Sequence, residues 1–392
     1  MAIHWYPGHM HKAQKEIKAI MPSVDLLIEV IDARIPFSSE NPMIAKLRRD
    51  KPCIKVLSKS DLADPAITAR WQAYLEREKN VKTIAITTAD PANTRKLIDQ
   101  CRKLFPNRDK AYSTIKTLIV GIPNVGKSTL INTLAGRTIA KTGNEPAITK
   151  AQQRINLDDG IVLFDTPGIL WPKVENINSG YRLAASGAIR DTAMEYDDVA
   201  FYILPYLLSS YPEALKDRFN FDELPPAALE FLEAVGAKRG CLKSGGRVNL
   251  NQVSKLFINE LRTGQLGRIS LETPEMIEQE LVQLEEEKAA KEEADKLRKS
   301  NFNSRNSSRE PQVDAVVSSP ASTTSTHGQT GEKSAIAPVT VKTAATTARG
   351  NAAKTTTVKA KASKGGASKP RTSNSKAPKA KAKPSLPKKP KR

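Results

Sequence analysis

The sequence predicts an α/β domain, a smaller all-helical domain after it, and a basic tail at the end of the chain. Short apolar runs of strand length recur through the first part, with helical patterns between several of them. After about residue 174 the strand signal fades and helical patterns continue alone. Beyond residue 301 the chain consists mainly of Ser, Thr, Ala, Pro and Lys, and such a segment cannot bury enough apolar surface to offset its ordering entropy. We therefore expect domains at 1–174 and 175–272, a charged helix at 273–300 and a disordered tail at 301–392.

The strands expected in the first domain cover residues 24–31, 53–57, 81–86, 116–120 and 161–164. Continuous apolar runs of this kind are typical of a parallel sheet that helices cover on both faces. The helical patterns between the strands include residues 67–79 and 94–105.

The second domain is expected to consist of helices at 181–190, 198–209, 226–235 and 249–262. In the last of these, the apolar side chains fall on one face of a helix. The next segment, 273–300, is dense in Glu, Lys and Ala, which predicts a solvated helix.

Charge is concentrated in the tail. The whole chain has 62 Lys and Arg against 42 Asp and Glu, and residues 301–392 hold 19 basic and 3 acidic residues. The first 300 residues are therefore close to neutral. A lysine-rich tail of this composition is expected to bind polyanions by counterion release. The alternative is a passive extension that keeps the protein in solution.

Several classes of protein are excluded. Cys53, Cys101 and Cys241 lie far apart in the chain, which excludes a disulfide scaffold and a cysteine-based zinc site. The longest apolar run, 199–208, has ten residues and contains Pro205, whereas a membrane span needs about 20. The first residues lack the apolar core of a signal peptide. We expect a soluble, cytoplasmic protein without a membrane partner.

A phosphate-binding loop is the strongest motif. Residues 121–128 read GIPNVGKS, which fits GxxxxGK[ST] between a predicted strand and a predicted helix. Lys127 is expected to reach the β- and γ-phosphates, and the Ser128 hydroxyl to bind Mg²⁺. The predicted nucleotide contacts of this loop are Asn124, Val125, Gly126, Lys127, Ser128 and Thr129.

Two further elements complete a magnesium and γ-phosphate site. Asp165-Thr166-Pro167-Gly168 follows a predicted strand, where Asp165 can hold the metal through water and the Gly168 N–H can contact the γ-phosphate. Thr149 lies between the phosphate loop and this motif, and it suits the switch threonine that completes the Mg²⁺ shell. The alternative for Thr149 is an ordinary loop threonine.

The element that reads the base comes earlier in the chain than the phosphate loop. Residues 58–61 read SKSD after the second predicted strand, and a carboxylate such as Asp61 can accept from the guanine N1–H and 2-amino group. Thr87, Thr88 and Ala89 follow the next strand, where a backbone N–H can meet guanine O6. The predicted base contacts are thus Ser58, Lys59, Asp61, Thr87, Thr88 and Ala89. Their order predicts a circularly permuted P-loop GTPase that binds GTP and GDP.

These features together resemble one known family. Residues 5–10 read WYPGHM, 32–36 read DARIP and 151–153 read AQQ, and with the permuted order they resemble the ribosome biogenesis GTPase A family of bacteria. The resemblance covers about residues 1–272. It implies a helical domain that contacts 23S rRNA, and a role in late maturation of the large (50S) ribosomal subunit, with binding to its precursor in the GTP state and release on hydrolysis.

This chain departs from the family pattern at two positions. Ser58 stands where the family usually has Asn, and Ala147 stands where it usually has Gly. The usual Asn braces the loop and contacts guanine N7, so Ser58 is expected to weaken nucleotide binding. Lys59 and Asp61 remain, so the preference for guanine should survive.

The catalytic group is not supplied by the usual position. Ile169 follows the DxxG motif, where many GTPases place a glutamine that orients water. The resemblance implies that His9 takes this role, and imidazole can orient or deprotonate water at neutral pH. The alternative is that His9 is structural or binds RNA. Asn124 resembles an asparagine that holds K⁺ near the phosphates in some GTPases, and its alternative is a turn residue.

Basic side chains are candidates for RNA contact, although each alone also suits a solvated surface charge. They are Lys12, Lys15, Lys18, Lys238, Arg239, Lys243, Arg247, Lys255 and Arg262. The leading hypothesis is a ribosome-stimulated GTPase, and the alternative is a low-turnover assembly scaffold, which Ser58 and Ile169 favour. A general nucleic-acid-binding protein would leave the nucleotide motifs unexplained. No heptad pattern predicts a dimer, so we expect a monomer.

Overall fold

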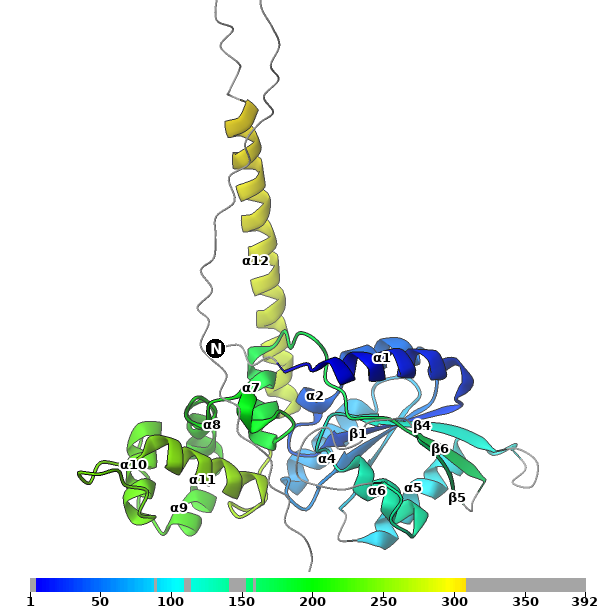
Figure 1. Cartoon of the computed structure of the whole chain (residues 1–392), viewed down its shortest axis with the longest axis horizontal. Helices are drawn as coiled ribbons and strands as arrows, with labels where there is room; N and C mark the ends of the chain where they lie inside the picture. The colour runs from blue at the N-terminus through cyan, green and yellow to red at the C-terminus, as the bar shows by residue number, and fades with distance from the viewer. Residues whose placement is uncertain (1–4, 88–89, 109–113, 141–152, 158–159, 308–392) are drawn as a thin grey trace, which may run out of the picture. The chain divides into compact units, whose positions relative to one another are not determined.

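A mixed β-sheet forms the centre of the first domain (Figure 1). The computed structural model describes residues 5–87, 90–108, 114–140, 153–157 and 160–307, and these belong to one compact unit. Within these ranges the strands are β1 (Leu26–Asp32), β2 (Cys53–Ser58), β3 (Val81–Ala85), β4 (Ile115–Gly121), β5 (Gln153–Leu157) and β6 (Ile161–Asp165). Their order across the sheet is β3-β2-β1-β4-β6-β5.

The predicted parallel sheet is confirmed except at one edge, where an antiparallel strand was not foreseen. Strands β1, β2, β3, β4 and β6 pair in parallel, whereas β5 pairs with β6 antiparallel. β5 alternates exposed side chains such as Arg154 with buried ones such as Ile155, because one of its faces is open to solvent. It therefore contains no apolar run, and no strand was predicted there.

Helices cover both faces of the sheet, as predicted: α1 lies over one face, and α5 and α6 lie over the other (Figure 1). Several of them begin at a proline that follows an Asp or Asn cap, as at Asp64 and Asp90, whose carboxylates accept from backbone N–H groups of the first turn. The helices of this domain are α1 (Gly8–Ile20), α2 (Pro36–Ser39), α3 (Pro42–Arg48), α4 (Pro65–Leu75), α5 (Pro91–Lys103) and α6 (Lys127–Ala135).

The helical part follows β6, as expected. Its helices are α7 (Ile177–Ser186), α8 (Tyr196–Ser210), α9 (Pro212–Phe219), α10 (Ala228–Lys238) and α11 (Leu250–Arg262). Phe219, Phe231 and Phe257 pack together at its centre. Helix α7 ends four residues earlier than expected, because Gly187 adopts φ +83° and its N–H caps the helix.

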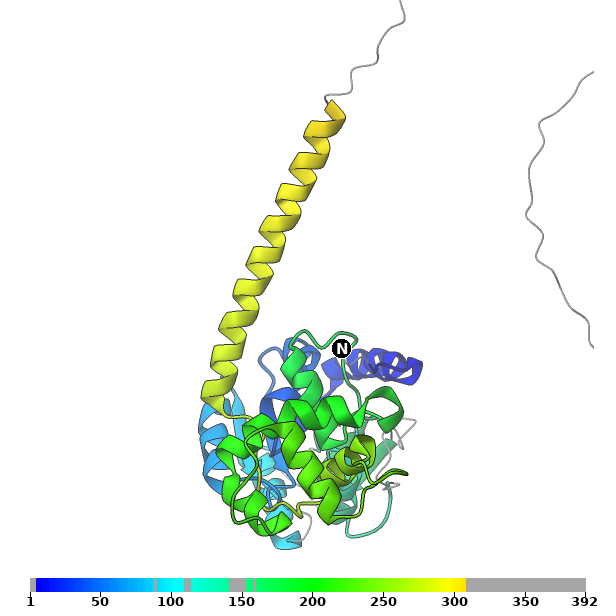
Figure 2. The same cartoon turned by 90° about the vertical axis from the view of Figure 1, so that its left-hand side faces the viewer.

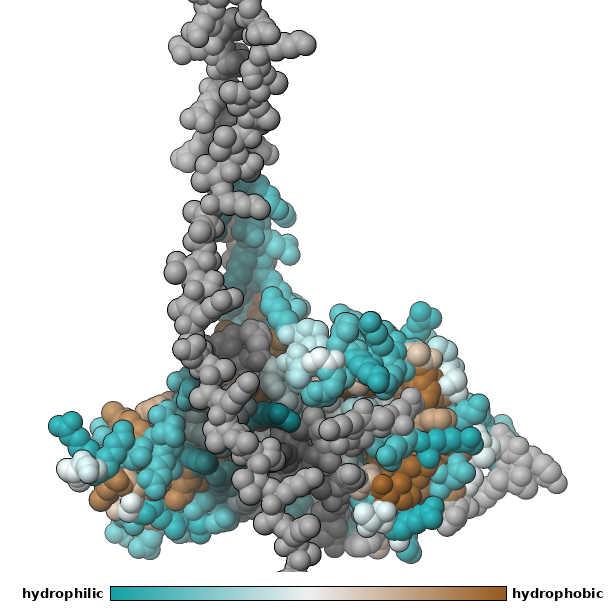
Figure 3. All heavy atoms as spheres, viewed as in Figure 1, coloured by the Kyte–Doolittle hydropathy of each residue, from teal (hydrophilic) through white to brown (hydrophobic). Residues whose placement is uncertain are grey.

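Helix α12 (Pro274–Ser307) differs from the expected solvated helix and tail. Its first turns pack onto the α/β domain, where Ile277 is fully buried in a cluster with Trp71. From residue 285 to 300 the side chains are exposed, and they are mainly hydrophilic in Figure 3 while the helix leaves the body in Figures 1 and 2. The helix continues seven residues into the segment expected to be disordered. Residues 308–392 lie outside the described residues.

The two domains expected at 1–174 and 175–272 are joined by buried polar contacts. Glu272, fully buried, accepts hydrogen bonds from the backbone N–H and the hydroxyl of Ser38, and Arg182 lies 3.6 Å from it. The segment before α12 thus returns to the α/β domain. No helix in the described ranges is long and apolar enough to cross a bilayer.

Candidate functional site

The phosphate loop connects β4 to α6, and its shape requires residues with unusual backbone angles. Asn124 and Gly126 have φ +56° and +96°. At Gly121 a Cβ atom would lie 2.4 Å from the carbonyl oxygen of Val30 on the neighbouring strand, so only glycine fits. The loop therefore bends tightly over the carboxyl end of the sheet and opens onto the N-terminus of α6, which suits a phosphate group.

Lys127 at the start of α6 is buried. Its Nζ donates to the carbonyl oxygens of Gly121 and Ile122, both at 3.2 Å. Burial lowers the pKa of Lys127 to about 8, and the nearby Asp165 carboxylate offsets only part of this effect. A desolvated ammonium group without a full counter-charge is well suited to bind phosphate oxygens.

Asp165 at the end of β6 is 1% exposed, and neither of its carboxylate oxygens has a hydrogen-bond partner among the residues described. Burial raises the pKa of Asp165 to about 6, although Lys127 and the nearby Thr166 N–H lower it in part. A buried carboxylate without partners is costly unless a ligand satisfies it. Mg²⁺ prefers oxygen ligands and keeps several waters, so Asp165 fits the outer part of a magnesium shell.

The segment after Asp165 lies directly on the phosphate loop. A Cβ atom on Gly168 would come within 2.8 Å of Pro123 Cα, and the Ile169 N–H donates to Gly121 O at 3.2 Å. The Ile169 side chain is 1% exposed and points into the core, so it cannot contact water at the site. The side-chain amide of Asn41 donates to the Ile169 carbonyl at 3.3 Å. Residues 165–170, which we call the switch segment, are thus held against the loop.

Ser58 connects the phosphate loop with the loop that follows β2. Its hydroxyl lies 2.6 Å from Val125 O and 2.9 Å from Ile31 O, and with one proton it donates to one carbonyl at a time. This contact braces the phosphate loop against the end of β2.

Lys59 and Asp61 follow Ser58 in what we call the base-reading loop, residues 58–64. Lys59 has φ +55°, and its Nζ donates to Asp32 Oδ2 at 2.9 Å. Asp61 is exposed, and the Ser60 N–H donates to Ile86 O at the end of β3. Because the parallel strands β2, β3 and β4 end at one edge of the sheet, the base-reading loop and the phosphate loop meet there, and the permuted order is confirmed.

Only some of the remaining predicted nucleotide contacts lie among the described residues. Thr129 lies in the first turn of α6, and the Thr87 carbonyl accepts from the N–H of Asp90. Thr88, Ala89 and Thr149 lie outside the described residues, as do Ala147, Ala151 and Gln152.

His9 is exposed at the start of α1, and no described contact joins it to the phosphate loop. The next residue, Met10, is fully buried, and its Sδ accepts from the Leu170 N–H at 3.5 Å. Burial, and to a lesser extent Arg190, lowers the pKa of His9. His9 is therefore one residue away from a direct contact with the switch segment.

Three of the predicted RNA-facing side chains are occupied within the protein. Lys238 donates to the carbonyls of Phe219 and Asn220, Arg239 lies 3.6 Å from Glu260, and Arg262 donates to the carbonyls of Ala184 and Ala185. The expectation that these three face RNA is therefore weakened by competing partners. Lys238 and Arg239 are exposed despite these contacts, as are the remaining candidates Lys12, Lys15, Lys18, Lys243, Arg247 and Lys255.

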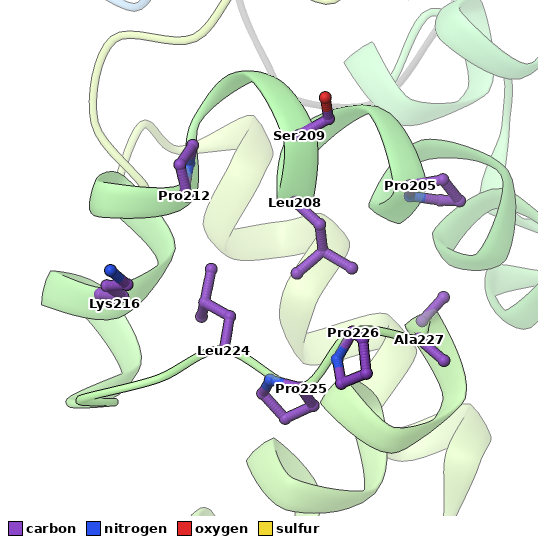
Figure 4. A pocket seen from close by; sticks show the side chains of 10 residues that line it. Pro205, Leu208, Ser209, Pro212, Lys216, Leu224, Pro225, Pro226 and Ala227 are labelled. Carbon is purple, nitrogen blue, oxygen red and sulfur yellow. The ribbon is translucent and has the colours of Figure 1, made fainter.

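A hollow of about 530 Å³ lies on the helical part (Figure 4). None of the predicted site residues lines it. Its walls come from α8, α9 and the start of α10, and they are Pro205, Leu208, Ser209, Pro212, Lys216, Leu224, Pro225, Pro226, Ala227 and Ala228.

Sequence reasoning missed the side chains that support the base-reading loop. Asp32 holds Lys59, and Arg268 donates to the carbonyls of Ser60 and Ala63. Asp32 follows β1 directly, so the rule that functional side chains gather at the carboxyl ends of parallel strands signals it. Nothing in the sequence near Arg268 signals its partners, because they lie more than 200 residues away.

Known proteins resemble this chain in sequence and structure. A family model described as "50S ribosome-binding GTPase" matches residues 116–214. The ribosome biogenesis GTPase A of Bacillus pumilus is 44% identical over 282 residues, which are 70% of this chain and all of that protein. The ribosome biogenesis GTPase A of Thermotoga maritima is 32% identical over 273 residues, covering 70% of this chain and 95% of that protein.

A solved structure, GNP-bound YlqF from T. maritima, is also similar. It shares 28% sequence identity with a TM-score of 0.49, and the match covers 68% of this chain and 99% of that one. Taken with the motifs at the sheet edge, the sequence relatives confirm the predicted family: this chain is a GTPase of ribosome biogenesis and belongs to the ribosome biogenesis GTPase A family.

Proposed function

We propose that the protein acts in late maturation of the large (50S) ribosomal subunit, binding its precursor and 23S rRNA in the GTP state and leaving after hydrolysis. One contact carries this proposal: the side-chain amide of Asn124 in the phosphate loop donates to the carbonyl of Gly187 at 2.9 Å. Gly187 caps α7, the first helix after the switch segment. A change at the phosphates therefore has a direct route to the helical part, on which RNA contacts are expected.

The metal is proposed to be Mg²⁺, held by Ser128, Thr149 and, through water, Asp165. When bound with nucleotide, Mg²⁺ neutralises charge on the phosphate oxygens. Lys127 contributes a second positive charge from a buried position. K⁺ is proposed to bind beside Asn124, whose amide is oriented by its bond to Gly187.

His9 is proposed to orient or deprotonate the attacking water, with Met10 linking this end of α1 to the switch segment. The variant His9→Gln is expected to lower hydrolysis in the presence of large subunits while leaving GDP affinity unchanged. His11→Gln is the matched control, since His11 is exposed on the same helix. An equal loss in both variants would favour the alternative role of His9 in RNA binding or structure.

RNA contact is assigned to the exposed basic residues of α1 and the helical part, together with the tail. Deleting residues 313–392 should make the affinity for RNA less dependent on salt concentration, because fewer counterions are released when the shortened protein binds. GTP hydrolysis without ribosomes should not change. A fall in basal hydrolysis would contradict the separate roles of tail and nucleotide site. The proposed activity concerns a monomer and takes place in the cytoplasm, where a ribosomal precursor would be met.

The affinity for 50S precursor particles tests the proposal directly. It should be higher with a non-hydrolysable GTP analogue than with GDP. Equal affinity in the two states would overturn the switch.

A second candidate function, a low-turnover assembly scaffold, is favoured by one observation. Ile169 is buried, so the position after the DxxG motif supplies no group that orients water. A scaffold would bind GTP and the precursor without marked hydrolysis in either the free or the bound state.

A further inference from the structure

Lys59 of the base-reading loop is held by an ion pair with Asp32, a residue outside the loop. Asp32 is fully buried and accepts from Lys59 Nζ at 2.9 Å, from Arg34 Nε at 2.9 Å and from Arg34 Nη2 at 2.8 Å. Two cations thus share one carboxylate, and they hold its pKa well below the usual range. The position of the Lys59 ammonium depends on where this carboxylate is fixed.

Arg34 connects the same carboxylate to the helical part. Its guanidinium, also buried, donates to the carbonyls of Leu261 and Arg262 at 3.4 and 3.3 Å, and to that of Ser186 at 3.5 Å. These are the last residues of α11 and α7. Carbonyls at a helix C-terminus lack partners within the helix and favour a cation, so Arg34 satisfies two helix ends and Asp32 at once.

The other side of the base-reading loop is held by the segment after α11. Arg268 Nε donates to Ala63 O at 3.1 Å and Arg268 Nη2 to Ser60 O at 3.2 Å. The Ile269 N–H donates to Leu62 O at 2.9 Å. Carbonyls before and after Asp61 are therefore fixed by residues 268–269, while the Asp61 side chain is exposed.

Both supports of the loop therefore depend on the helical part, which lies more than 100 residues further along the chain. We propose that Arg34 and Arg268 are positioning residues for guanine recognition, which make nucleotide affinity and base selectivity depend on how the helical part is seated. This inference rests on the proposed role of Asp61 and Lys59 in reading guanine. By linkage, a partner that moves the ends of α7 and α11 also changes guanine nucleotide affinity.

The ratio of the dissociation constants for two nucleotides that differ only in the base is a suitable measurement, because a general loss of stability would not change it. Inosine diphosphate (IDP) lacks the 2-amino group of guanine, so it loses one of the two contacts expected from Asp61. Dissociation constants for GDP and IDP should be measured for the full-length wild type, for Arg268→Gln and for Arg70→Gln. Arg70→Gln is the control, because the exposed Arg70 pairs with Glu275 in α12 and makes no described hydrogen bond to the base-reading loop.

We expect Arg268→Gln to weaken GDP binding about fivefold and IDP binding by less than about twofold, so that the preference for GDP falls. Arg70→Gln should match the wild type for both nucleotides. Turnover at saturating GTP should stay within about twofold in Arg268→Gln, because the substituted side chain does not contact the phosphate loop.

Arg34 acts through Asp32 and Lys59, so its effect should disappear when Lys59 is changed. Arg34→Lys should weaken GDP binding about tenfold when it is introduced into the wild type. When it is introduced into a protein that already carries Lys59→Met, it should weaken GDP binding by less than about twofold. Such non-additivity is expected for two residues of one hydrogen-bonded network. Arg34→Lys keeps a cation next to Asp32, and the exposed Arg268 provides an independent test if that variant does not fold.

Three results would overturn the inference while leaving the proposed guanine site intact. An unchanged GDP-to-IDP preference in Arg268→Gln would do so, as would an equal change in Arg70→Gln or additive losses for Arg34→Lys and Lys59→Met. A wild type that does not prefer GDP to ADP would overturn the proposed guanine site itself, and the inference with it.

Discussion

Replacing Asp165 by asparagine should stabilise the protein without ligands and abolish its response to magnesium. The carboxylate is 1% exposed and has no hydrogen-bond partner among the described residues. Its pKa is about 6 in the folded chain against 3.8 for an ordinary aspartate. Once ionised, such a group costs the folded state about 3 kcal/mol. A neutral isostere of the same shape removes this cost.

The pH dependence has a definite sign. The pKa of Asp165 is raised in the folded state, so the folded protein holds this proton more tightly than the unfolded chain does. The resulting contribution to the free energy of unfolding is fully present below pH about 4 and is lost as the pH rises through about 6. Wild type and Asp165→Asn should therefore have equal free energies of unfolding near pH 4. The variant should be more stable by about 2–3 kcal/mol at pH 7.5.

Urea unfolding at both pH values, in the presence of a chelator and without nucleotide, measures this difference. Asp25→Asn is the contrasting control, since Arg108 lowers the pKa of Asp25 and its loss should destabilise the protein at pH 7.5. In the same variants, magnesium should tighten GTP binding to the wild type and to Asp25→Asn, but not to Asp165→Asn. An Asp165→Asn variant that is less stable than the wild type at pH 7.5 would refute the reasoning, because the carboxylate would then have favourable partners.

Three further substitutions test the supports of the site. Ser58→Ala should lower the free energy of unfolding by about 1–2 kcal/mol and weaken GDP binding, because a buried carbonyl of Val125 or Ile31 loses its donor; urea unfolding and GDP titration measure both, and unchanged values would contradict the bracing role. Gly168→Ala should slow single-turnover hydrolysis about tenfold or more while changing GDP affinity little, because its Cβ must move the switch segment away from Pro123; normal hydrolysis would show that this close contact is dispensable. Ile277→Ala should cost about 2–4 kcal/mol in urea unfolding, because the side chain is fully buried beside Trp71; a loss below about 1 kcal/mol would mean that α12 does not depend on this anchor.

Local patterns predicted most of the α/β domain. The five apolar runs became β1, β2, β3, β4 and β6 with ends shifted by at most two residues, because their side chains are almost all buried, with only Lys82 of β3 and Lys116 of β4 exposed. Strand β5 was missed because its sequence alternates polar and apolar residues, and its pairing with β6 decides its structure. The end of α7 was misplaced because a single residue, Gly187, stops a pattern that otherwise continues.

The candidate residues of the proposed nucleotide site could be named from the sequence for a similar reason. Lys127, Ser128 and Asp165 belong to short segments whose spacing follows from a strand, a turn and a helix. The supporting contacts could not be predicted, because they join residues that only the fold brings together. Asn124 with Gly187 and Arg268 with Ser60 are examples, and the bracing by Ser58 depends on where Val125 lies.

Hydrolysis of GTP by the full-length protein in potassium buffer, with and without large ribosomal subunits, tests the central claim most directly. A switch acting on the ribosome should turn over slowly alone and much faster with the subunits, and replacing K⁺ by Na⁺ should lower both rates if Asn124 helps to hold a monovalent cation. Measurable GTP binding with equally slow hydrolysis in both conditions would contradict the switch and would favour the scaffold.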